Sequence, residues 1–310
     1  MKAMILAAGY GTRLKPLTLL RPKPLFPILN KPLLSIIIEQ LRQIGITEIA
    51  INTHHLSEQI EEFIRSSSRH VIHVLKEELI LGTGGGLRNA ERFLDGAPFL
   101  VINGDILTNI DLKAVYDFHM ISGNAVTMVL HDYPKYNNVL IGRGDRITGF
   151  SRRKDGHMAF TGIHVVNPEV LKLVPEGGFY DILDAYRALI AMDSSVGAYV
   201  VDGRYWTDIG TEKAYLTLHG DLLQGKAEVS GVPVPGKMFI IGENASVGEG
   251  VQLEDWVCIG NNVDIGDGAY IARSVVWDGA RIDARMKVVD AVIARSPFTV
   301  HRSPCEINAH

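Results

Sequence analysis

The chain of 310 residues has few cysteines, little net charge and no long hydrophobic run. Its two cysteines are too few for a disulfide framework and favour a reducing compartment. The formal net charge of −4 gives no basis for a nucleic-acid partner or an anionic membrane surface. No apolar run nears the roughly 20 residues of a membrane span, and the apolar stretch in "MKAMILAAGYG" is shorter than the roughly 7–15 residues of a signal-peptide core. We therefore expect a soluble, cytoplasmic protein.

The first two thirds of the chain alternate short apolar runs with amphipathic stretches. Short apolar runs indicate buried strands, and the stretches between them have helical spacing. This alternation predicts an α/β fold, a Rossmann-like and mostly parallel sheet flanked by helices. Ligands bind such sheets at the carboxyl ends of the strands, so site residues are expected in the loops there. The expected strands are 2–8, 48–53, 70–77, 98–104 and 125–131, and the expected helices are 33–45, 56–67, 84–94 and 111–121.

The composition changes near residue 224, where a segment with two prolines and three glycines indicates a linker. Apolar residues then recur every six positions in two columns, which matches the hexapeptide repeat of a parallel β-helix. A small β-sandwich with glycine turns is the alternative. We expect domains at 1–223 and 238–310, joined by a linker at 224–237, with a short left-handed β-helix followed by a capping segment at the C-terminal end. The first column is Ile241, Val247, Leu253, Ile259, Ile265, Ile271 and Trp277, and the second is Ala245, Val251, Val257, Val263, Ala269 and Val275.

A glycine loop follows the first apolar run, in "ILAAGYGTRLKPLT". Gly9 and Gly11 permit positive φ values that aim backbone N–H groups into a concavity, which suits a phosphate. Arg13 adds a planar donor fork that suits a polyphosphate. In "RPKPL", Lys23 lies between two prolines that stiffen its backbone. The loop is neither a P-loop nor a full G-x-G-x-x-G, so an ordinary strand–turn connection and a solvated lysine remain alternatives.

Two further motifs point to a nucleotide site. "VINGD" ends a buried strand at Asp105, and Asp208 in "WTDIG" is the natural second carboxylate. Carboxylates at strand ends can hold a hard cation such as Mg²⁺. Asn-Gly in "VINGD" is also a hairpin signal, but a helical stretch follows it instead of a partner strand. In "LGTGGGL", consecutive glycines allow a flat base or ribose to approach the backbone closely, and Glu77 and Glu78 precede it.

These motifs stand in the order typical of the sugar-1-phosphate nucleotidylyltransferases, or NDP-sugar pyrophosphorylases, which the chain resembles over residues 1–220. The similarity also includes "INTHHLSEQI", "FTGIHVV" and "WTDIGT". It implies that 1–223 is a catalytic domain that transfers a nucleotidyl group from an NTP to a sugar 1-phosphate and releases pyrophosphate. The C-terminal repeat resembles that of guanylyltransferases that make GDP-mannose or GDP-heptose, which favours GTP. "TGGG" equally resembles uridylyltransferases, including the muramic acid 1-phosphate type, so UTP is the alternative.

The same resemblance implies the roles of the catalytic residues. Arg13 neutralises the leaving pyrophosphate, and Lys23 contacts the reacting phosphate. Asp105 and Asp208 together bind the catalytic Mg²⁺, which is the cofactor expected. The nucleotide-binding residues implied are Leu6, Ala7, Ala8, Gly9, Gly11, Thr12, Arg13, Lys23, Glu78, Gly82, Thr83, Gly84, Asn103, Gly104 and Asp105.

The sugar side of the site departs from the family pattern. "FTGIHVV" resembles the sugar-binding strand and implies sugar-phosphate contacts by Thr161 and Gly162. Many members carry a Glu-Lys pair before this strand, whereas "FSRRKDG" has no acid at that place. Arg153 is expected to replace the lysine as a contact to the sugar phosphate. The identity of the sugar stays open.

Two different classes of function remain as alternatives. An acyltransferase centred on the β-helix is disfavoured because 236–277 contains no histidine to act as a base. A non-catalytic scaffold is disfavoured because Lys23 and both aspartates are present. A metal site at His54 and His55 is disfavoured because adjacent side chains on an extended backbone point to opposite faces. The β-helix is expected to form a homo-oligomer, since its open ends expose unpaired strand edges, and an allosteric site there is a further alternative.

Overall fold

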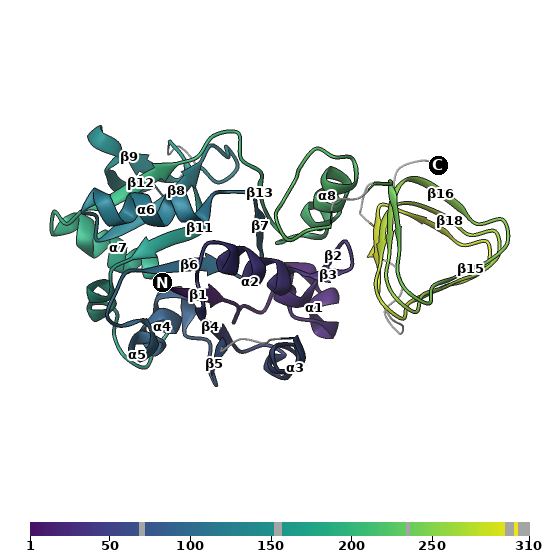
Figure 1. The fold of residues 1–310 in the computed structure, drawn as a ribbon, viewed down its shortest axis with the longest axis horizontal. Helices are drawn as coiled ribbons and strands as arrows, with labels where there is room; N and C mark the ends of the chain where they lie inside the picture. Colours follow the sequence, from purple (N-terminus) through teal and green to yellow (C-terminus); the bar gives the residue numbers. More distant parts are fainter. Residues whose placement is uncertain (68–71, 152–156, 234–235, 295–300, 303–310) are drawn as a thin grey trace. The chain divides into compact units, whose positions relative to one another are not determined.

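The computed structural model describes residues 1–67, 72–151, 157–233, 236–294 and 301–302 (Figure 1). The chain forms two compact units. The first unit contains Met1–Tyr10 and Ile37–Trp206, and the second contains Gly11–Ile36 and Thr207–His310. The N-terminal segment that carries Arg13 and Lys23 therefore belongs to the same unit as the C-terminal strands. The domain boundaries expected at 223 and 238 stay a prediction.

The first unit contains a seven-stranded sheet in the order β12-β8-β11-β6-β1-β4-β5. Neighbouring strands are parallel except at β11, which is antiparallel to both β6 and β8. The central strands are buried on both faces, as a near-continuous apolar run requires. The prediction of an α/β fold with a mostly parallel sheet is confirmed. The strands are β1 (Lys2–Leu6), β4 (Glu48–Thr53), β5 (Ile72–Lys76), β6 (Phe99–Asn103), β8 (Val126–His131), β11 (Ala159–Val166) and β12 (Val196–Val200).

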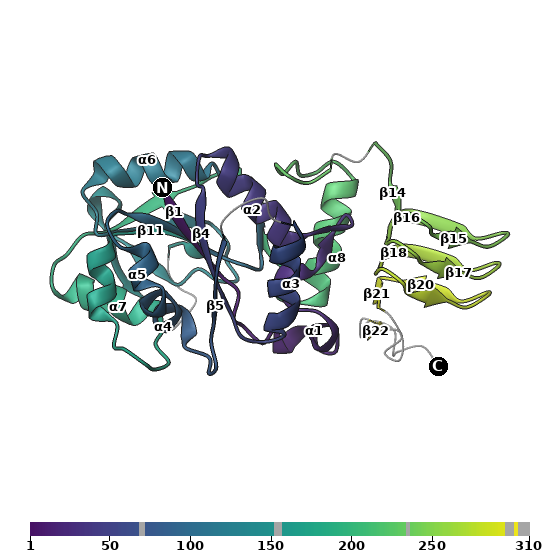
Figure 2. The ribbon, with the colours of Figure 1, turned by 60° about the horizontal axis from the view of Figure 1, so that its bottom comes forward.

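Amphipathic helices cover both faces of this sheet. Figure 2 shows α6 on one face and α4, α5 and α7 on the other. Local sequence sets the helix ends: Asp111 caps α6 by accepting from the Ala114 N–H, and Gly123 ends that helix with a φ of 70°. The helices are α2 (Leu33–Gln43), α3 (Ser57–Ser67), α4 (Gly82–Asn89), α5 (Glu91–Leu94), α6 (Leu112–Ser122) and α7 (Ile182–Ala191). Shorter elements are β7 (Ile106–Thr108), the antiparallel pair β9 (Val139–Ile141) and β10 (Ile147–Phe150), 3₁₀ turns at Arg143–Asp145 and Pro168–Leu173, and β13 (Trp206–Asp208).

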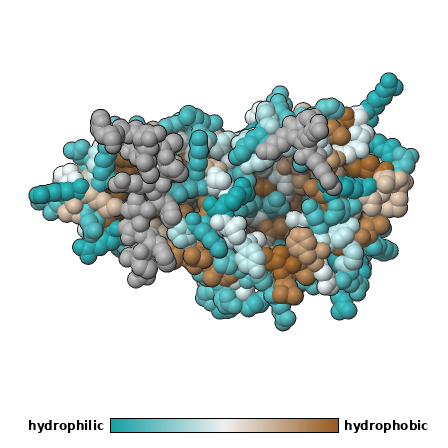
Figure 3. All heavy atoms as spheres, turned by 180° about the vertical axis from the view of Figure 1, so that it is seen from behind, coloured by the Kyte–Doolittle hydropathy of each residue, from teal (hydrophilic) through white to brown (hydrophobic). Residues whose placement is uncertain are grey.

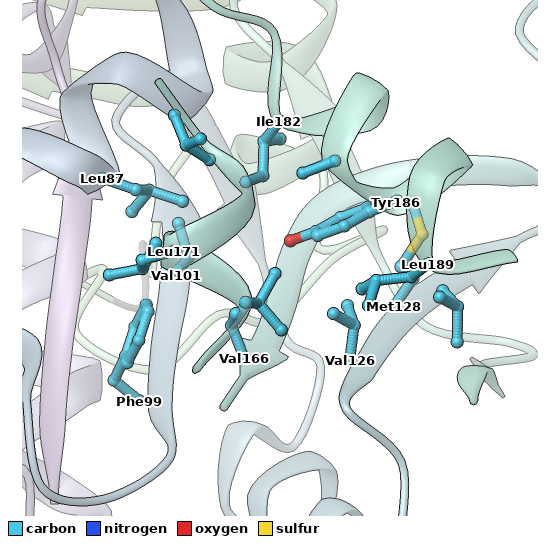
Figure 4. Packing of buried hydrophobic residues seen from close by; sticks show 14 of the residues in the cluster. Leu87, Phe99, Val101, Val126, Met128, Val166, Leu171, Ile182, Tyr186 and Leu189 are labelled. Atoms are coloured by element: carbon cyan, nitrogen blue, oxygen red, sulfur yellow. The ribbon is translucent and has the colours of Figure 1, made fainter. Parts of the chain in front are cut away.

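The core of the first unit lies between the sheet and the helices α4, α5 and α7. Leu87 from α4 and Tyr186 from α7 point toward Val101 and Val166 of the sheet (Figure 4). Leu87 and Tyr186 are completely buried. Burying side chains of this size removes apolar surface from water at roughly 25 cal/mol per Å², which is the main term holding these layers together. The helix that begins with the glycines of "LGTGGGL" is thus anchored by the residue that follows them.

The second unit combines short N-terminal elements, one long helix and the C-terminal strands. The 3₁₀ turn Lys23–Leu25 is followed directly by Phe26, which is completely buried. The N-terminal elements are the 3₁₀ turns Thr12–Leu14 and Lys23–Leu25, α1 (Leu17–Leu20), β2 (Pro27–Ile28) and β3 (Lys31–Pro32), and the long helix is α8 (Glu212–Leu223).

The C-terminal strands form a stack in which paired residues lie 17 or 18 positions apart. The spacing is 18 in the first ladders, as in the hydrogen bond from Glu243 N to Asn261 Oδ1. Three hexads give this spacing, and the ladders are parallel from β14 through β21. Figure 2 shows the successive layers above one another. We call Phe239–Ile293 the strand stack. Its strands are β14 (Phe239–Ile241), β15 (Ser246–Val247), β16 (Gln252–Ile259), β17 (Asp264–Ile265), β18 (Tyr270–Val276), β19 (Arg281–Ile282), β20 (Lys287–Val289) and β21 (Ala291–Ile293), and β22 (His301–Arg302) pairs antiparallel to β21.

The repeat loses one residue within β18, between Ala272 and Ser274, and the prediction that Trp277 continues the first column was wrong. The spacing changes to 17 between Asn261 and Asp278. The inner core accordingly contains Ile259 and Val276. Trp277 instead packs edge-on against Phe26, with ring centroids 4.7 Å apart. The strand stack thus contacts the residue directly after the Lys23 turn.

Polar contacts join the same parts of the second unit. The side-chain amide of Asn30 donates to the Ile259 carbonyl at 2.7 Å, and the Cys258 thiol donates to Asn30 Oδ1 at 3.3 Å. Trp277 Nε1 donates to the hydroxyl of Tyr215 at 3.2 Å. These side chains come from the strand stack, from α8 and from the N-terminal segment, so hydrogen bonds join the three parts of the second unit.

The face of the molecule shown in Figure 3 carries both hydrophilic and hydrophobic side chains, and its hydrophobic patches are separated by hydrophilic residues. Within the ranges that the structure describes, no helix is long and apolar enough to cross a membrane.

Candidate active site

The glycine loop lies at the end of β1 and continues into the second unit. Ala7 and Ala8 are buried, and a methyl group added at Gly9 would meet no atom within 4 Å, so the backbone there faces open space. Gly11 has a φ of 62°, in the left-handed region that favours glycine. The position that a side chain would occupy at Gly9 is therefore open, which leaves room for a ligand at this point of the loop. Leu6 ends the strand itself, and Thr12 begins the 3₁₀ turn that carries Arg13.

Within the second unit, Gly11 leaves room for Lys23. A methyl group at Gly11 would lie 2.9 Å from Cε of Lys23 and 2.8 Å from Cγ2 of Thr18. The hydroxyl of Thr18 donates to the Gly11 carbonyl at 3.2 Å, which holds the loop against α1. The aliphatic chain of Lys23 thus passes directly over Gly11.

Gly210 brings Arg13 and Asp208 together. A methyl group at Gly210 would lie 2.8 Å from Nη2 of Arg13 and 2.8 Å from Oδ2 of Asp208. The guanidinium and the carboxylate therefore approach the same point of the backbone from different elements. Three of the four charged residues predicted to be catalytic belong to this unit, whereas Gly210 itself did not stand out in the sequence.

The fourth, Asp105, follows β6 in the first unit. The Gly104 N–H donates to the Leu6 carbonyl at 2.8 Å and so joins the "NGD" turn to the end of β1. Asn103 lies over Gly162, where a methyl group would be 2.5 Å from Asn103 Nδ2. Gly162 has a φ of 76° and interrupts the register between β11 and β8. The "NGD" turn and the predicted sugar-binding strand are therefore neighbours.

Thr161 and Arg153 are the other two residues predicted to contact the sugar phosphate. The hydroxyl of Thr161 is completely buried and donates to the Val129 carbonyl at 2.8 Å, so it serves the sheet. The Thr161 carbonyl accepts from Nε1 of Trp206 at 2.9 Å. Arg153 lies outside the described residues.

The glycine-rich segment starts α4, and packing accounts for its glycines. The Tyr180 carbonyl accepts from the N–H groups of Gly84 at 2.8 Å and Gly85 at 3.2 Å. Gly82 has a φ of 72°, and a methyl group there would lie 2.7 Å from the Tyr180 carbonyl oxygen. The hydroxyl of Thr83 donates to Asp181 Oδ1 at 3.2 Å. The glycines let two backbone segments pack together, a role that the sequence-based prediction of base contact did not include.

Of the two glutamates before this segment, Glu78 is exposed and Glu77 is buried, with 3% of its surface exposed. The carboxylate of Glu77 accepts from Asn52 Nδ2 at 2.7 Å. His54 contacts the Glu77 carbonyl at 2.8 Å and the Tyr10 hydroxyl at 3.1 Å, which fits a structural role. Sequence reasoning named Glu77 beside Glu78 but chose Glu78 as the nucleotide-binding residue, and it missed Asn52, although Asn52 and Glu77 both stand at strand ends, the position at which site residues were expected.

Two buried groups at the sugar-side strand, His164 and Tyr186, have shifted pKa values. Burial lowers the pKa of His164 to about 3, so this histidine is neutral at physiological pH. Its Nδ1 lies 3.1 Å from the hydroxyl of Tyr186, whose pKa burial raises well above the usual value. Neither group titrates near neutral pH, so neither is suited to act as an acid or base there.

Comparisons with known proteins show the family of the chain. The family model described as Nucleotidyl transferase matches residues 2–225, and the model described as GMPPB C-terminal domain matches residues 236–301. The chain belongs to the nucleotidyl transferase family, which confirms the resemblance found in the sequence and makes the protein a nucleotidyltransferase.

Individual relatives differ in the nucleotide that their names give. The chain is 29% identical to the UTP–glucose-1-phosphate uridylyltransferase of Synechocystis, with 94% of this chain and 87% of the relative covered. It is 31% identical to mannose-1-phosphate guanylyltransferase 1 of Arabidopsis thaliana, with 94% and 86% covered. The crystal structure of HddC from Yersinia pseudotuberculosis has the same fold, with a TM-score of 0.60 at 23% identity over 70% of this chain and 97% of that one.

Proposed function

We propose that the protein joins an NTP to a sugar 1-phosphate, giving an NDP-sugar and pyrophosphate. A phosphate oxygen of the sugar 1-phosphate forms a bond to the α-phosphorus, and the bond from that phosphorus to the bridging oxygen of the β-phosphate breaks. The observation that carries the proposal is the convergence of Arg13 and Asp208 at Gly210, with Lys23 beside Gly11 in the same unit. The names of the Synechocystis and Arabidopsis relatives support the sugar 1-phosphate as the acceptor.

The chain's own groups have separable roles in this step. Arg13 offers a planar fork of donors to the departing pyrophosphate, and the ammonium of Lys23 neutralises charge on the reacting phosphate. The glycine loop at Gly9 and Gly11 binds the triphosphate, together with the other nucleotide-binding residues expected from the sequence. Gly162 lies next to the sugar phosphate, with Asn103 above it.

The carboxylates fit Mg²⁺ as the cofactor. Asp105 and Asp208 supply hard oxygen ligands, which Mg²⁺ prefers, and this ion ordinarily keeps several waters and binds substrate phosphates. Among the residues that the structure describes, no group of three or more acidic, histidine or cysteine side chains gathers as a metal site. That finding fits an ion shared with the substrate better than an ion enclosed by protein. When bound, Mg²⁺ would neutralise charge on the phosphates of the nucleotide.

The preferred nucleotide is proposed to be GTP, with UTP as the second candidate. The match to the GMPPB C-terminal domain and the guanylyltransferase relatives favour GTP, whereas the Synechocystis relative favours UTP. The test is pyrophosphate release from GTP, UTP, ATP and dTTP with a panel of hexose 1-phosphates, with and without Mg²⁺. We expect pyrophosphate release when GTP is combined with one of the hexose 1-phosphates, and no release with any combination in the absence of Mg²⁺. Absence of release with every pairing, in a folded sample, would reject the enzymatic proposal and leave a scaffold role.

We further propose that the strand stack is a left-handed parallel β-helix that forms a homo-oligomer. The 18-residue ladders and the inner apolar core support the β-helix. Ile241 and Val247, in the first strands of the stack, are 51% and 43% exposed, as side chains at an open end would be. Light scattering on Ile241→Glu should show a smaller species than the wild type. The same mass for both proteins would reject this interface.

A further inference from the structure

Two buried polar side chains of the first unit join the glycine loop to the glycine-rich segment. Asn52, at the end of β4, is 2% exposed, and Glu77, just after β5, is 3% exposed. A buried carboxylate is costly unless its oxygens are hydrogen-bonded, so each of its contacts carries weight. The Glu77 carboxylate accepts from neutral N–H groups, one of the Asn52 amide and one of the Leu81 backbone.

Three consecutive hydrogen bonds form what we call the Asn52–Glu77 relay. The Ala7 N–H donates to Asn52 Oδ1 at 2.8 Å. Asn52 Nδ2 donates to Glu77 Oε1 at 2.7 Å. The Leu81 N–H donates to Glu77 Oε2 at 3.0 Å. The relay therefore ends two residues before Gly9 on one side and one residue before Gly82 on the other.

The surrounding backbone leaves space for the relay. A methyl group at Gly86 would lie 2.7 Å from Asn52 Nδ2 and 3.0 Å from Glu77 Oε1. The third glycine of "GGG" is thus accounted for by the relay, and the first two by Tyr180 and Gly178. A further bond, from the Glu77 N–H to the Thr53 carbonyl at 2.7 Å, fixes the backbone of Glu77 beside β4.

We propose that Asn52 and Glu77 are positioning residues. They hold the base-binding segment in the position, relative to the glycine loop that binds the triphosphate, that nucleotide binding requires. They control nucleotide affinity and base selection without touching the reacting atoms. This inference rests on the proposed function, in which the glycine loop binds the triphosphate and Gly82–Gly84 belong to the nucleotide-binding residues; we place the base against Gly82–Gly84, where consecutive glycines allow a flat ring to approach the backbone. The relay fixes the distance between these two segments through side chains with defined hydrogen-bonding directions.

The directions of the three bonds allow a test by exchange. In Glu77→Gln, two amides must satisfy backbone N–H groups at both ends, so every orientation leaves one donor facing another donor. In Asn52→Asp, two carboxylates face each other with like charge. The double variant Asn52→Asp/Glu77→Gln restores all three bonds, because the amide introduced at position 77 then donates to the new carboxylate and accepts from the Leu81 N–H. It also keeps the wild-type net charge and nearly the same volumes.

The experiment measures calorimetric dissociation constants of GTP and UTP for the full chain, with steady-state kinetics and melting temperatures. Where the lost hydrogen bond lets the two segments shift apart in the free protein, returning them to the binding position costs a free energy of the size of that bond, which corresponds to roughly 10-fold in affinity. Each single variant should therefore raise the Kd and KM of the preferred nucleotide by about that factor and shrink its preference over the other nucleotide. We expect kcat at saturating nucleotide to stay near the wild-type value, and the double variant to bind within about 3-fold of the wild type. Glu62→Gln, at an exposed glutamate on α3, is the control for loss of one charge.

Several outcomes would overturn the inference. Folded single variants with wild-type Kd and nucleotide preference would show that the relay is merely structural, even if they melt earlier. A double variant that binds no better than the single variants would show that the bond pattern is irrelevant. Should a single variant fail to fold, Gly86→Ala displaces Asn52 without changing any donor, and a wild-type Kd in that variant would count against the relay. If the wild type binds no NTP at all, the proposed function fails first.

Discussion

Replacing Gly210 with alanine places a methyl group between two residues proposed to be catalytic. The added carbon would lie 2.8 Å from Arg13 Nη2 and 2.8 Å from Asp208 Oδ2. Ordinary contacts begin at 3.4 Å, so both groups must retreat by about 0.6 Å. Gly210 is not among the residues with positive φ, so alanine adds no backbone strain there.

The size of the effect follows from that displacement. A misplacement of about 1 Å costs on the order of 10²-fold in rate, so Gly210→Ala should lower kcat by roughly 10- to 100-fold. Because the groups that move are the ends of flexible side chains, the melting temperature should change little. The assay is pyrophosphate release at saturating substrates, with thermal unfolding measured on the same samples.

A matched control separates this effect from the general cost of an added methyl group. Gly149→Ala, in β10, would place its carbon 3.7 Å from Leu140 Cδ1, which is an ordinary contact. We expect that variant to keep the wild-type kcat. If folded Gly210→Ala turned over within about 3-fold of the wild type, the assignment of Arg13 and Asp208 to the reaction would be refuted.

Three further predictions concern binding and stability. Gly9→Ala meets no atom within 4 Å, so calorimetry should show an NTP Kd raised by about 10-fold or more at an unchanged melting temperature, and an unchanged Kd would place the triphosphate elsewhere. Because burial lowers the pKa of His164 to about 3, the unfolded chain takes up a proton first as the pH falls below about 6.5. The free energy of unfolding therefore falls with falling pH, by about 2 kcal/mol at pH 5. In His164→Gln, urea titrations at pH 7 and pH 5 should show a smaller loss between the two pH values. An equal loss in both proteins would contradict the assignment of this pH dependence to His164. Trp277 is 3% exposed and packs on Phe26, so Trp277→Ala should lower the free energy of unfolding by about 3–5 kcal/mol. A decrease below about 1 kcal/mol in denaturant titrations would show that this contact is weak.

The periodic parts of the fold were predictable from the sequence. Apolar runs and helical spacing placed β1, β4, β6 and β8 within a few residues of their bounds, because burial on both faces demands such runs. The antiparallel direction of β11 was not predictable, since an apolar strand has the same pattern in both directions. Trp277 was misplaced because one missing residue in the repeat turns the next side chain outward, toward Phe26.

The sequence singled out candidate site residues where the chemistry lies in one motif. Arg13 stood out because it follows a glycine loop that permits unusual backbone conformations, and Lys23 because two prolines restrict its backbone. Asn52 and its hydrogen bond to Glu77 were missed because this bond depends on how separate strand ends pack side by side. Gly210 was missed for the same reason: the need for glycine there arises from two side chains that converge on it in the folded unit.

The fate of a labelled α-phosphate decides whether this chain transfers a nucleotidyl group. The protein would be incubated with Mg²⁺, a sugar 1-phosphate and GTP carrying isotopic label at the α-position, and the products separated. We expect the label to appear in the nucleotide sugar while unlabelled pyrophosphate forms in equal amount. Label remaining in GTP, or orthophosphate in place of pyrophosphate, would contradict nucleotidyl transfer by this chain.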